Sequence, residues 1–332
     1  MDKIELVLDS FKGKNEKYPL FSLWKHFPHA DRDPENLTEA HVSFYERHKF
    51  DLMKISPHGR FPVVDFGCKV ADEYDPFTGS TSCEECSMKN IQDWETIEQL
   101  DVGEGELGRQ LRAIELINKE LEELPKMMTV FSPLMVASKM DTNLEGNLLK
   151  NPEIMKSAFF VLLDIVTEFA LSSIDAGADG IFLASQHFRK TSLPWKEVER
   201  FEIAFLDKFI SRIKGKSDFT VLHVHGQDIQ FDEVSEKLNA DALNWHDQLT
   251  WPTMAEALDI FPKGLLAGID ETKTLLDGSE ENIKQNITES FELSKNNNNR
   301  IIIAPGCVIP ITASEESINI ISSTMMKLRN RV

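Results

Sequence analysis

From residue 51 onward, short apolar runs alternate with longer amphipathic stretches, and this alternation limits the possible folds more than any other feature. Strands that alternate with helices predict βαβ units and a parallel sheet. Eight such runs favour a closed (β/α)₈ barrel of the α/β class. The expected strands are 50–56, 61–67, 126–133, 178–186, 219–226, 240–247, 264–270 and 300–307, and the expected helices are 104–123, 152–175, 195–213 and 313–329.

The remaining segments fit around one barrel domain that spans residues 1–332. Residues 1–50 are expected to form an N-terminal extension that caps the barrel mouth. Residues 68–100 are expected to form an inserted loop with a short helix. No linker rich in Pro, Gly or Ser divides the chain, so a single domain is the simplest account.

Charge and hydropathy exclude several classes of partner. The chain has 36 Lys and Arg against 55 Asp and Glu, a net charge of −19, which argues against nucleic acid as a partner. No apolar run is expected to reach the roughly 20 residues of a membrane span, and the first residues lack a secretory apolar region. We therefore expect a cytoplasmic monomer or homodimer without a membrane partner.

Polar residues stand at nearly every expected strand end. In a (β/α)₈ barrel the chemistry lies at the carboxyl ends of the strands, where all strands meet at one mouth. Some of these residues are expected to bind substrate and others to act in catalysis. The residues at the strand ends are Lys54, Asp65, Ser132, Ser185, Gln186, His187, His223, His225, His246, Asp247, Asp270 and Cys307.

The sharpest motif is His223-Val224-His225-Gly226. Side chains alternate along a strand, so His223 and His225 share a face. Two imidazoles on one face can form half of a metal site. The competing interpretation is one histidine satisfied by hydrogen bonds and one exposed to solvent.

The last expected strand ends in Pro305-Gly306-Cys307. A lone cysteine is usually a small buried hydrophobe. Barrel closure, however, would bring Cys307 to the histidine pair, and two imidazoles with one thiolate suit a catalytic zinc. His246 or Asp247 could then serve as a fourth ligand or support the ligands.

Two further clusters are less informative. Cys83-Glu84-Glu85-Cys86 has the spacing of a metal half-site, but no second such pair accompanies it, and we expect a loop. The segment 24–32, which contains Trp24, His26 and Arg32, either covers the barrel mouth or forms a polar loop.

These motifs together resemble the uroporphyrinogen decarboxylase superfamily, whose fold is a (β/α)₈ barrel. The resemblance runs from about residue 20 to the end, and no single motif carries it. The matching stretches, in order, are FDLMKISPHGRFPVVDFG, DAGADGIFLASQHF, VLHVHGQD, GLLAGID and IIIAPGCVIP.

Within the superfamily, the chain resembles the zinc- and corrinoid-dependent methyltransferases more than the heme-pathway decarboxylases. The decarboxylases carry an N-terminal arginine-rich motif that engages substrate carboxylates, whereas this region reads LWKHFPHADRD. The methyltransferases carry His-x-Cys on one strand and a late Cys. His223 and Cys307 match that pattern, and His225 stands where the family has the first Cys. This exchange makes the metal site more positive by one charge.

The resemblance implies a zinc-dependent methyltransferase in which His223, His225 and Cys307 hold the metal. Methylcobalamin or a corrinoid protein would be the methyl donor, and a folate, thiol or other small molecule the acceptor. The expected catalytic residues are Asp247 and Asp270, and the expected substrate-binding residues are Trp24, His26, Arg32, Lys54, Asp65, Gln186, His187 and His246.

Two alternatives remain open at this point. One is a metal-free decarboxylase of a tetrapyrrole or another poly-acid, which would need Lys54, Arg32 or Arg60 to bind carboxylates. The other is a non-catalytic barrel that binds a corrinoid partner.

Overall fold

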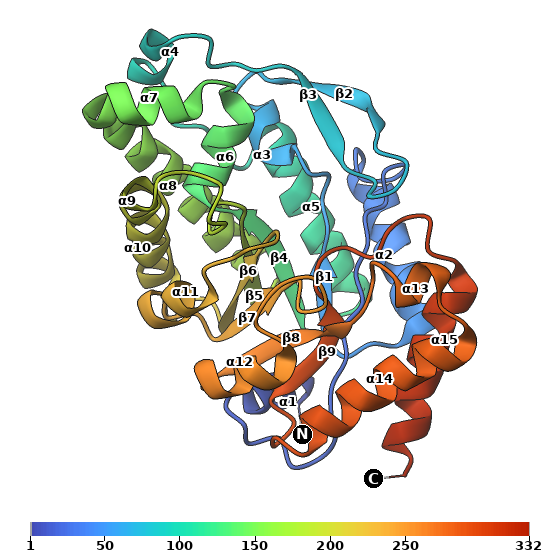
Figure 1. Cartoon of the computed structure of the whole chain (residues 1–332). Helices are drawn as coiled ribbons and strands as arrows, with labels where there is room; N and C mark the ends of the chain where they lie inside the picture. The colour runs from blue at the N-terminus through green and yellow to red at the C-terminus, as the bar shows by residue number, and fades with distance from the viewer. Residues whose placement is uncertain (1, 332) are drawn as a thin grey trace.

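A curled parallel sheet of seven strands, in the order β1-β4-β5-β6-β7-β8-β9, forms the centre of the molecule. The computed structural model describes residues 2–331. Helices surround the sheet (Figure 1). The strands are β1 (Met53–Ile55), β4 (Lys126–Phe131), β5 (Gly180–Ser185), β6 (Phe219–Val224), β7 (Ala242–Trp245), β8 (Gly264–Ile269) and β9 (Ile301–Pro305).

The N-terminal segment fills the gap between β9 and β1. Phe21 forms a parallel bridge with Ile303, and the amide of Asp51, just before β1, donates to the carbonyl of Phe21 at 2.9 Å. Residues 20–22 therefore take the position of an eighth strand. The α/β barrel-like fold is confirmed, with this segment in place of one predicted strand.

The predicted strand 61–67 is wrong. Residues Phe61–Val64 form the short helix α3, with Pro62 in its first turn. Proline lacks the N–H that a central strand must donate, and its fixed φ suits the first turn of a helix. The apolar run FPVV is buried as predicted but in a helical conformation.

The segment 68–100 contains the predicted short helix, but strands replace most of the predicted loop. It contains an antiparallel hairpin of β2 (Lys69–Tyr74) and β3 (Thr81–Glu85), which stands apart from the barrel sheet (Figure 1). The helix α4 (Ile91–Glu95) follows the hairpin. Alternating exposed and less exposed residues along both strands fit a ribbon with one solvated face.

The other helices connect the strands or follow them. The predicted helix 195–213 is interrupted by the π-helical turn η1. These elements are α1 (Lys3–Phe11), α2 (Pro34–His48), α5 (Gly105–Glu120), α6 (Pro133–Met140), α7 (Leu144–Lys150), α8 (Pro152–Asp175), α9 (Trp195–Val198), η1 (Glu199–Ile203), α10 (Ala204–Ile213), α11 (Phe231–Lys237), α12 (Met254–Ile260), α13 (Thr274–Asp277), α14 (Glu280–Lys295) and α15 (Glu315–Arg329).

The first 50 residues do not form one cap over the mouth. Phe11 of α1 packs on Phe219, the first residue of β6, with ring centroids 5.5 Å apart. Helix α1 therefore covers the amino ends of the strands, opposite the mouth. The stretch that contains Trp24 and His26 reaches the carboxyl side, where both line a cavity.

Helix α8 has the length and composition of a membrane span, with a mean hydropathy of 1.7 in its most apolar window, which the sequence prediction overlooked. More than half of that window, 56%, is buried within the molecule. Phe159, Leu162 and Leu163 are fully buried in the main hydrophobic core. The apolar character of α8 is therefore explained by packing inside the fold.

Two hydrophobic clusters separate the inside of the barrel from its outside. Phe219 and Val221 of β6 belong to the inner cluster, whereas Leu222 and Val224 belong to the outer one, between sheet and helices. The alternation along β6 therefore turns His223 into the barrel, as the strand pattern predicts.

Candidate metal centre and active-site cavity

Three histidines and one cysteine converge at the carboxyl ends of β6, β7 and β9. One ligand atom from each of His223, His225, His246 and Cys307 lies within 4.8 Å of the other three. The structure thus brings together the three residues expected to bind metal and adds His246, which the sequence suggested as a substrate-binding residue or a fourth ligand.

Asn244 on β7 sets the orientation of His223. Its amide nitrogen donates to the carbonyls of Leu266 (2.8 Å) and Pro305 (3.0 Å), so its oxygen faces the imidazole. His223 Nδ1 lies 2.6 Å from that oxygen and must donate to it. The Nε2 lone pair of His223 is therefore free for a metal, an arrangement common among metal-binding histidines.

Glu271 supports the other side of the cluster. Its buried carboxylate accepts the backbone N–H groups of Gly306 (3.1 Å) and Cys307 (3.0 Å), and it lies 3.6 Å from His246 Nδ1. A side chain at Gly306 would come within 2.7 Å of the Trp245 carbonyl, so the turn that carries Cys307 requires glycine.

Asp270, predicted as catalytic, is not among the residues that line the cavity. Its two carboxylate oxygens accept N–H and hydroxyl groups from Thr272, Lys273 and Thr274, which fixes the turn after β8. The next residue, Glu271, is the one that faces the cluster. Sequence reasoning missed Glu271 and Asn244; for Asn244, its position two residues before His246 on one strand face was an available signal.

Charge in the cluster is balanced between Cys307 and His246. Burial raises the pKa of the Cys307 thiol, but hydrogen bonds with His223, His225 and His246 outweigh burial and hold that pKa well below its usual range. Burial lowers the pKa of His246, but Cys307 and Glu271 outweigh it and raise the pKa to about 10. Both shifts favour a thiolate at Cys307 beside a protonated His246. A thiolate with imidazoles is a donor set that fits zinc, which would replace the proton on His246.

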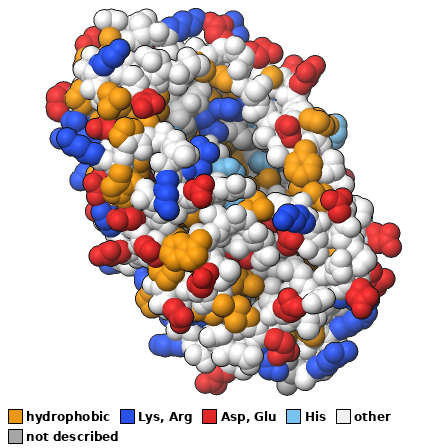
Figure 2. Space-filling model, viewed as in Figure 1, with side chains coloured by type: hydrophobic (Ala, Val, Ile, Leu, Met, Phe, Trp, Pro, Cys, Tyr) orange, Lys and Arg blue, Asp and Glu red, His pale blue; other side chains and the backbone are white. Residues whose placement is uncertain are grey.

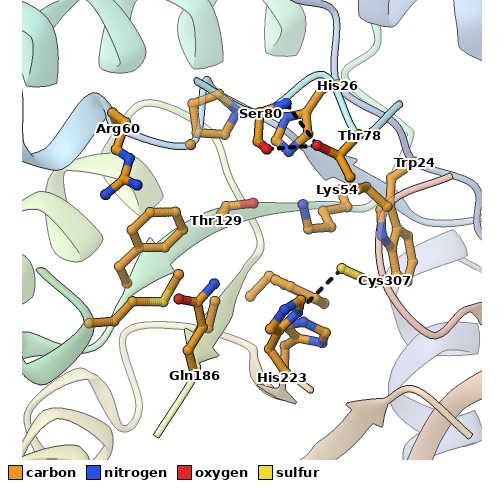
Figure 3. A pocket seen from close by; sticks show the side chains of 18 of the residues that line it. Trp24, His26, Lys54, Arg60, Thr78, Ser80, Thr129, Gln186, His223 and Cys307 are labelled. Carbon is orange, nitrogen blue, oxygen red and sulfur yellow. Dashed lines mark hydrogen bonds between the residues drawn. The ribbon is translucent and has the colours of Figure 1, made fainter. Parts of the chain in front are cut away.

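The cluster forms one wall of a cavity of about 350 Å³. Histidine side chains are visible at the bottom of a hollow with Lys or Arg side chains beside it (Figure 2). Cys307 lies on one side of the cavity and Arg60 on the opposite side (Figure 3). Four of the predicted substrate-binding residues line this cavity, namely Trp24, His26, Lys54 and Gln186.

Three basic side chains line the cavity, namely Lys54, Arg60 and Lys139. Lys54 Nζ donates to Ser56 Oγ at 3.1 Å and lies 4.8 Å from the centre of the Phe182 ring. Burial lowers the pKa of Lys54 to about 8, despite the opposing charge of Cys307. Burial, with the nearby charge of Arg60, lowers the pKa of Lys139 to about 7. Lys139 was not predicted as a site residue.

Two predicted substrate-binding residues, Arg32 and Asp65, are not among the residues that line the cavity, and both bond to the backbone. The Arg32 guanidinium donates to the carbonyl of Ala71 at 2.9 Å. The Asp65 carboxylate accepts the amides of Glu106 (2.8 Å) and Leu107 (2.9 Å), at the start of α5. Asp65 was assigned to a strand end, but it follows α3 and accepts two N–H groups of the first turn of α5, as a capping residue does.

His187 and Asp247 are also absent from the residues that line the cavity. Burial lowers the pKa of His187 to about 4, so its imidazole is neutral. Asp247, predicted as catalytic, accepts the amide of Gly268 at 3.3 Å, and burial raises its pKa to about 7. His187 follows Gln186, which lines the cavity, and Asp247 follows His246, which belongs to the cluster. Because neighbouring side chains in an extended chain point to opposite sides, His187 and Asp247 point away from the site.

The family model described as uroporphyrinogen decarboxylase (URO-D) matches residues 20–328. The chain belongs to the uroporphyrinogen decarboxylase family. The matched region begins at the segment that closes the barrel and contains the whole cluster.

Relatives within and around this family are distant in sequence. The chain is 18% identical to methylcobamide:CoM methyltransferase MtbA of Methanosarcina mazei, over 78% of this chain and 76% of that protein. A solved methyltransferase from Methanosarcina mazei superimposes with a TM-score of 0.83 at 18% identity, covering 99% of both chains. A B12-independent methionine synthase from Shewanella sp. W3-18-1 gives 0.63 at 12% identity, covering 95% of this chain and 98% of the other. At these identities the two structures establish the shared fold.

Proposed function

We propose that the protein is a metal-dependent methyltransferase that moves a methyl group between a corrinoid and a small-molecule acceptor, a folate or a thiol. The convergence of His223, His225, His246 and Cys307 at the barrel mouth carries this proposal. Similarity to a methylcobamide:CoM methyltransferase supports the same reaction class.

Zinc is the metal that the donor set favours, because neutral imidazoles and one thiolate are typical zinc ligands. When bound, zinc would supply Lewis acidity that lowers the pKa of an acceptor heteroatom and orients it toward the methyl group. A site with the His-x-Cys pattern and a late Cys has two thiolate ligands, whereas this site has only Cys307. Its net charge with zinc bound would therefore be more positive by one. That charge favours an acceptor which depends on Lewis-acid activation.

Chain residues around the cluster hold the acceptor and its charge. Lys54 lies on the cavity wall close enough to Cys307 for their charges to interact. As an ammonium it would stabilise a negative heteroatom at the reacting end of the acceptor. Trp24 and Gln186 line the same space and would provide an apolar face and an amide for orientation.

The far side of the cavity suits an anionic group on the small molecule. Arg60 and Lys139 both line it, and Arg60 is held by a bond from its Nε to the Thr81 carbonyl at 3.2 Å. No carboxylate lies among the residues that line this cavity within the described chain, 2–331. Two cations without a nearby acid would pair with a carboxylate, sulfonate or phosphate.

Methyl transfer from methylcobalamin tests the proposal. Purified protein with bound zinc is mixed with methylcob(III)alamin and either tetrahydrofolate or a small anionic thiol, and loss of the methylcobalamin absorbance is followed. We expect turnover with one acceptor class, and a loss of at least about 100-fold in rate for His223→Ala and Cys307→Ala.

His29→Ala is the matched control, because His29 is exposed and hydrogen-bonded to Tyr74 rather than to the cluster. It should keep the wild-type rate. Unchanged rates in His223→Ala and Cys307→Ala would contradict the proposed use of the cluster.

The decarboxylase alternative has one observation in its favour, the cationic lining of Lys54, Arg60 and Lys139. It leaves the histidine and cysteine cluster without a role. Release of CO₂ from uroporphyrinogen by metal-free protein, abolished in Arg60→Ala, would favour it over methyl transfer. The third alternative, a non-catalytic corrinoid partner, predicts corrinoid binding without turnover in the same assay.

A further inference from the structure

Lys139 differs from the other buried lysines because its amine has no partner. Three lysines are buried in the described chain, 2–331, namely Lys54, Lys126 and Lys139. Lys126 Nζ donates to Asn118 Oδ1 at 2.9 Å, and Lys54 Nζ donates to Ser56 Oγ at 3.1 Å. Among residues 2–331, no hydrogen-bond acceptor and no carboxylate lies within bonding distance of Lys139 Nζ. This amine nevertheless belongs to a residue that lines the active-site cavity.

The surroundings of this amine are apolar on one side and cationic on the other. Nζ lies 5.1 Å from the centre of the Phe131 ring, and Met135, one turn earlier on α6, also lines the cavity. The face of a ring attracts a cation but accepts no conventional hydrogen bond, so an ammonium at Lys139 would keep unsatisfied donors. The positive charge of Arg60, which lines the same cavity, disfavours the ammonium further.

These surroundings favour the neutral amine. Burial first, and Arg60 second, lower the pKa of Lys139 to about 7, so a large fraction of the side chain is unprotonated at neutral pH. A desolvated lysine beside another cationic group is an activated nucleophile toward carbonyl carbon. The lone pair that an ammonium would hold in an N–H bond is then available for attack.

Arg60 provides the matching contact for an acid group on the same ligand. Its Nε donates to the Thr81 carbonyl at 3.2 Å, which anchors the guanidinium at the cavity wall. The two terminal nitrogens of the fork can then hold a carboxylate. A ligand with a carbonyl next to a carboxylate would therefore meet a nucleophile and a cation together.

We propose that Lys139 forms an imine with the carbonyl carbon of a small oxo acid whose carboxylate pairs with Arg60. The amine nitrogen bonds to the carbonyl carbon, and the carbonyl oxygen leaves as water with the two protons of the amine. The step needs no oxidant, reductant or second substrate. Arg60 lies across the cavity from Cys307 (Figure 3). The imine is therefore a second chemistry of this cavity, separate from methyl transfer at the histidine cluster.

Lys54 provides an internal comparison, because it lines the same cavity. Its amine has an acceptor in Ser56, and the opposing charge of Cys307 favours its protonated form. Neither influence acts on Lys139 in the same way. Reaction with a carbonyl compound should therefore select Lys139 over Lys54.

Reductive trapping with glyoxylate tests the proposal on the full-length, zinc-loaded protein. Sodium cyanoborohydride converts an imine of glyoxylate into a stable carboxymethyl group on the lysine, which intact mass measurement counts and peptide mapping locates. We expect one carboxymethyl group at Lys139, formed at least about 10-fold faster than at Lys54 or at the exposed Lys156. Mapping on the wild type identifies the reacting lysine without any variant that has to fold.

Three substitutions separate the nucleophile from the cation that holds the acid. Lys139→Arg keeps the positive charge and should abolish the rapid modification, whereas Lys54→Arg, the matched control in the same cavity, should keep it. Arg60→Met should slow trapping of glyoxylate at least about 10-fold. With acetaldehyde, which has no acid group, Arg60→Met should react within a few-fold of the wild-type rate.

Carboxymethyl groups spread over exposed lysines without an excess at Lys139 would overturn the proposal. So would preferred modification of Lys54, or an equal effect of Arg60→Met on glyoxylate and acetaldehyde. None of these results bears on methyl transfer from methylcobalamin, which is measured without a carbonyl compound.

Discussion

At the scale of single residues, hydrogen bonds fix the side chains of the proposed metal site. Asn244 sets the tautomer of His223, and Glu271 holds the turn of Cys307 through two backbone N–H groups. Ligands held in this way lose little freedom on binding, so residues that never touch the metal still determine its affinity.

Replacing Asn244 tests that dependence. Asn244→Ala removes the acceptor for His223 Nδ1, so the imidazole can rotate or change tautomer. We expect the dissociation constant for zinc to rise roughly 10- to 100-fold, as measured by competition with a chromogenic chelator.

The matched control for this prediction is Asn147→Ala. Asn147 is also a buried asparagine, but its amide donates to Asp141 at 2.8 Å, and neither residue belongs to the cluster. It should keep wild-type zinc affinity despite some loss of stability. Equal zinc affinity in both variants would show that Asn244 does not orient His223.

Two features explain which site residues could be predicted: the alternation of side chains along a strand, and the meeting of all strand ends at one mouth of the barrel. His223 and His225 follow from alternation along one strand, and Cys307 follows from its place at the end of the last strand. Asn244 and Glu271 act through contacts with residues 21 and 35 positions away, which no local pattern encodes. Asp270 was predicted from its place at the end of its strand, whereas the next residue, Glu271, is the one that contacts the turn of Cys307.

At the scale of elements, the π-helical turn η1 places a carboxyl group in the interior. Glu202 is 0% exposed. Burial raises its pKa to about 7, although the hydroxyls of Ser185 and Ser132 act in the opposite direction. The side chain is therefore mostly neutral in the folded protein below pH 7, whereas in the unfolded chain it ionises near its usual pKa.

This difference predicts how stability changes with pH. Between the unfolded pKa of about 4.5 and the folded pKa of about 7, the folded state binds more protons. The contribution of neutral Glu202 to the free energy of unfolding is therefore fully present below pH 4.5. It falls as the pH rises above 4.5 and is lost once the pH has passed 7. Glu202→Gln should be more stable than wild type at pH 8, by up to about 3 kcal/mol, and this advantage should disappear near pH 4.5.

Urea unfolding of both proteins across this pH range measures the difference directly. An advantage for Glu202→Gln that stays constant with pH would show that ionisation of Glu202 is not its cause.

Elements with strong periodicity were the ones that sequence alone predicted. Seven of the eight expected strands are present, as are the helices expected at 104–123, 152–175 and 313–329. The segment 61–67 failed because a buried apolar run has no period, and only Pro62 indicated a helix start. The hairpin β2–β3 failed because its charged residues concealed the strand alternation.

At the scale of the whole molecule, closure of the barrel depends on the N-terminal segment. Residues 20–22 connect β9 to the start of β1, and Phe21 is fully buried there. This contact joins residues almost 300 positions apart, so no local pattern could predict it. It also explains why the chain has seven sheet strands and still forms a closed mouth.

Phe21→Ala should therefore destabilise the entire fold. Loss of a fully buried phenylalanine is expected to lower the free energy of unfolding by about 3–5 kcal/mol, measured by urea denaturation. Phe77→Ala is the control, because the Phe77 side chain is 44% exposed, and its effect should stay within about 0.5 kcal/mol. Similar values for the two variants would contradict the closing role of residues 20–22.

Zinc content tests the central claim most directly, because the closed barrel is what brings four ligands from three strands together. Elemental mass spectrometry is performed on untagged wild type, His223→Ala, Cys307→Ala and the control Cys83→Ser, all prepared without chelators. We predict that His223→Ala and Cys307→Ala each lose one zinc per chain relative to wild type, while Cys83→Ser retains that zinc. Wild-type protein without zinc, or variants that keep the same zinc content, would contradict a metal centre at the barrel mouth.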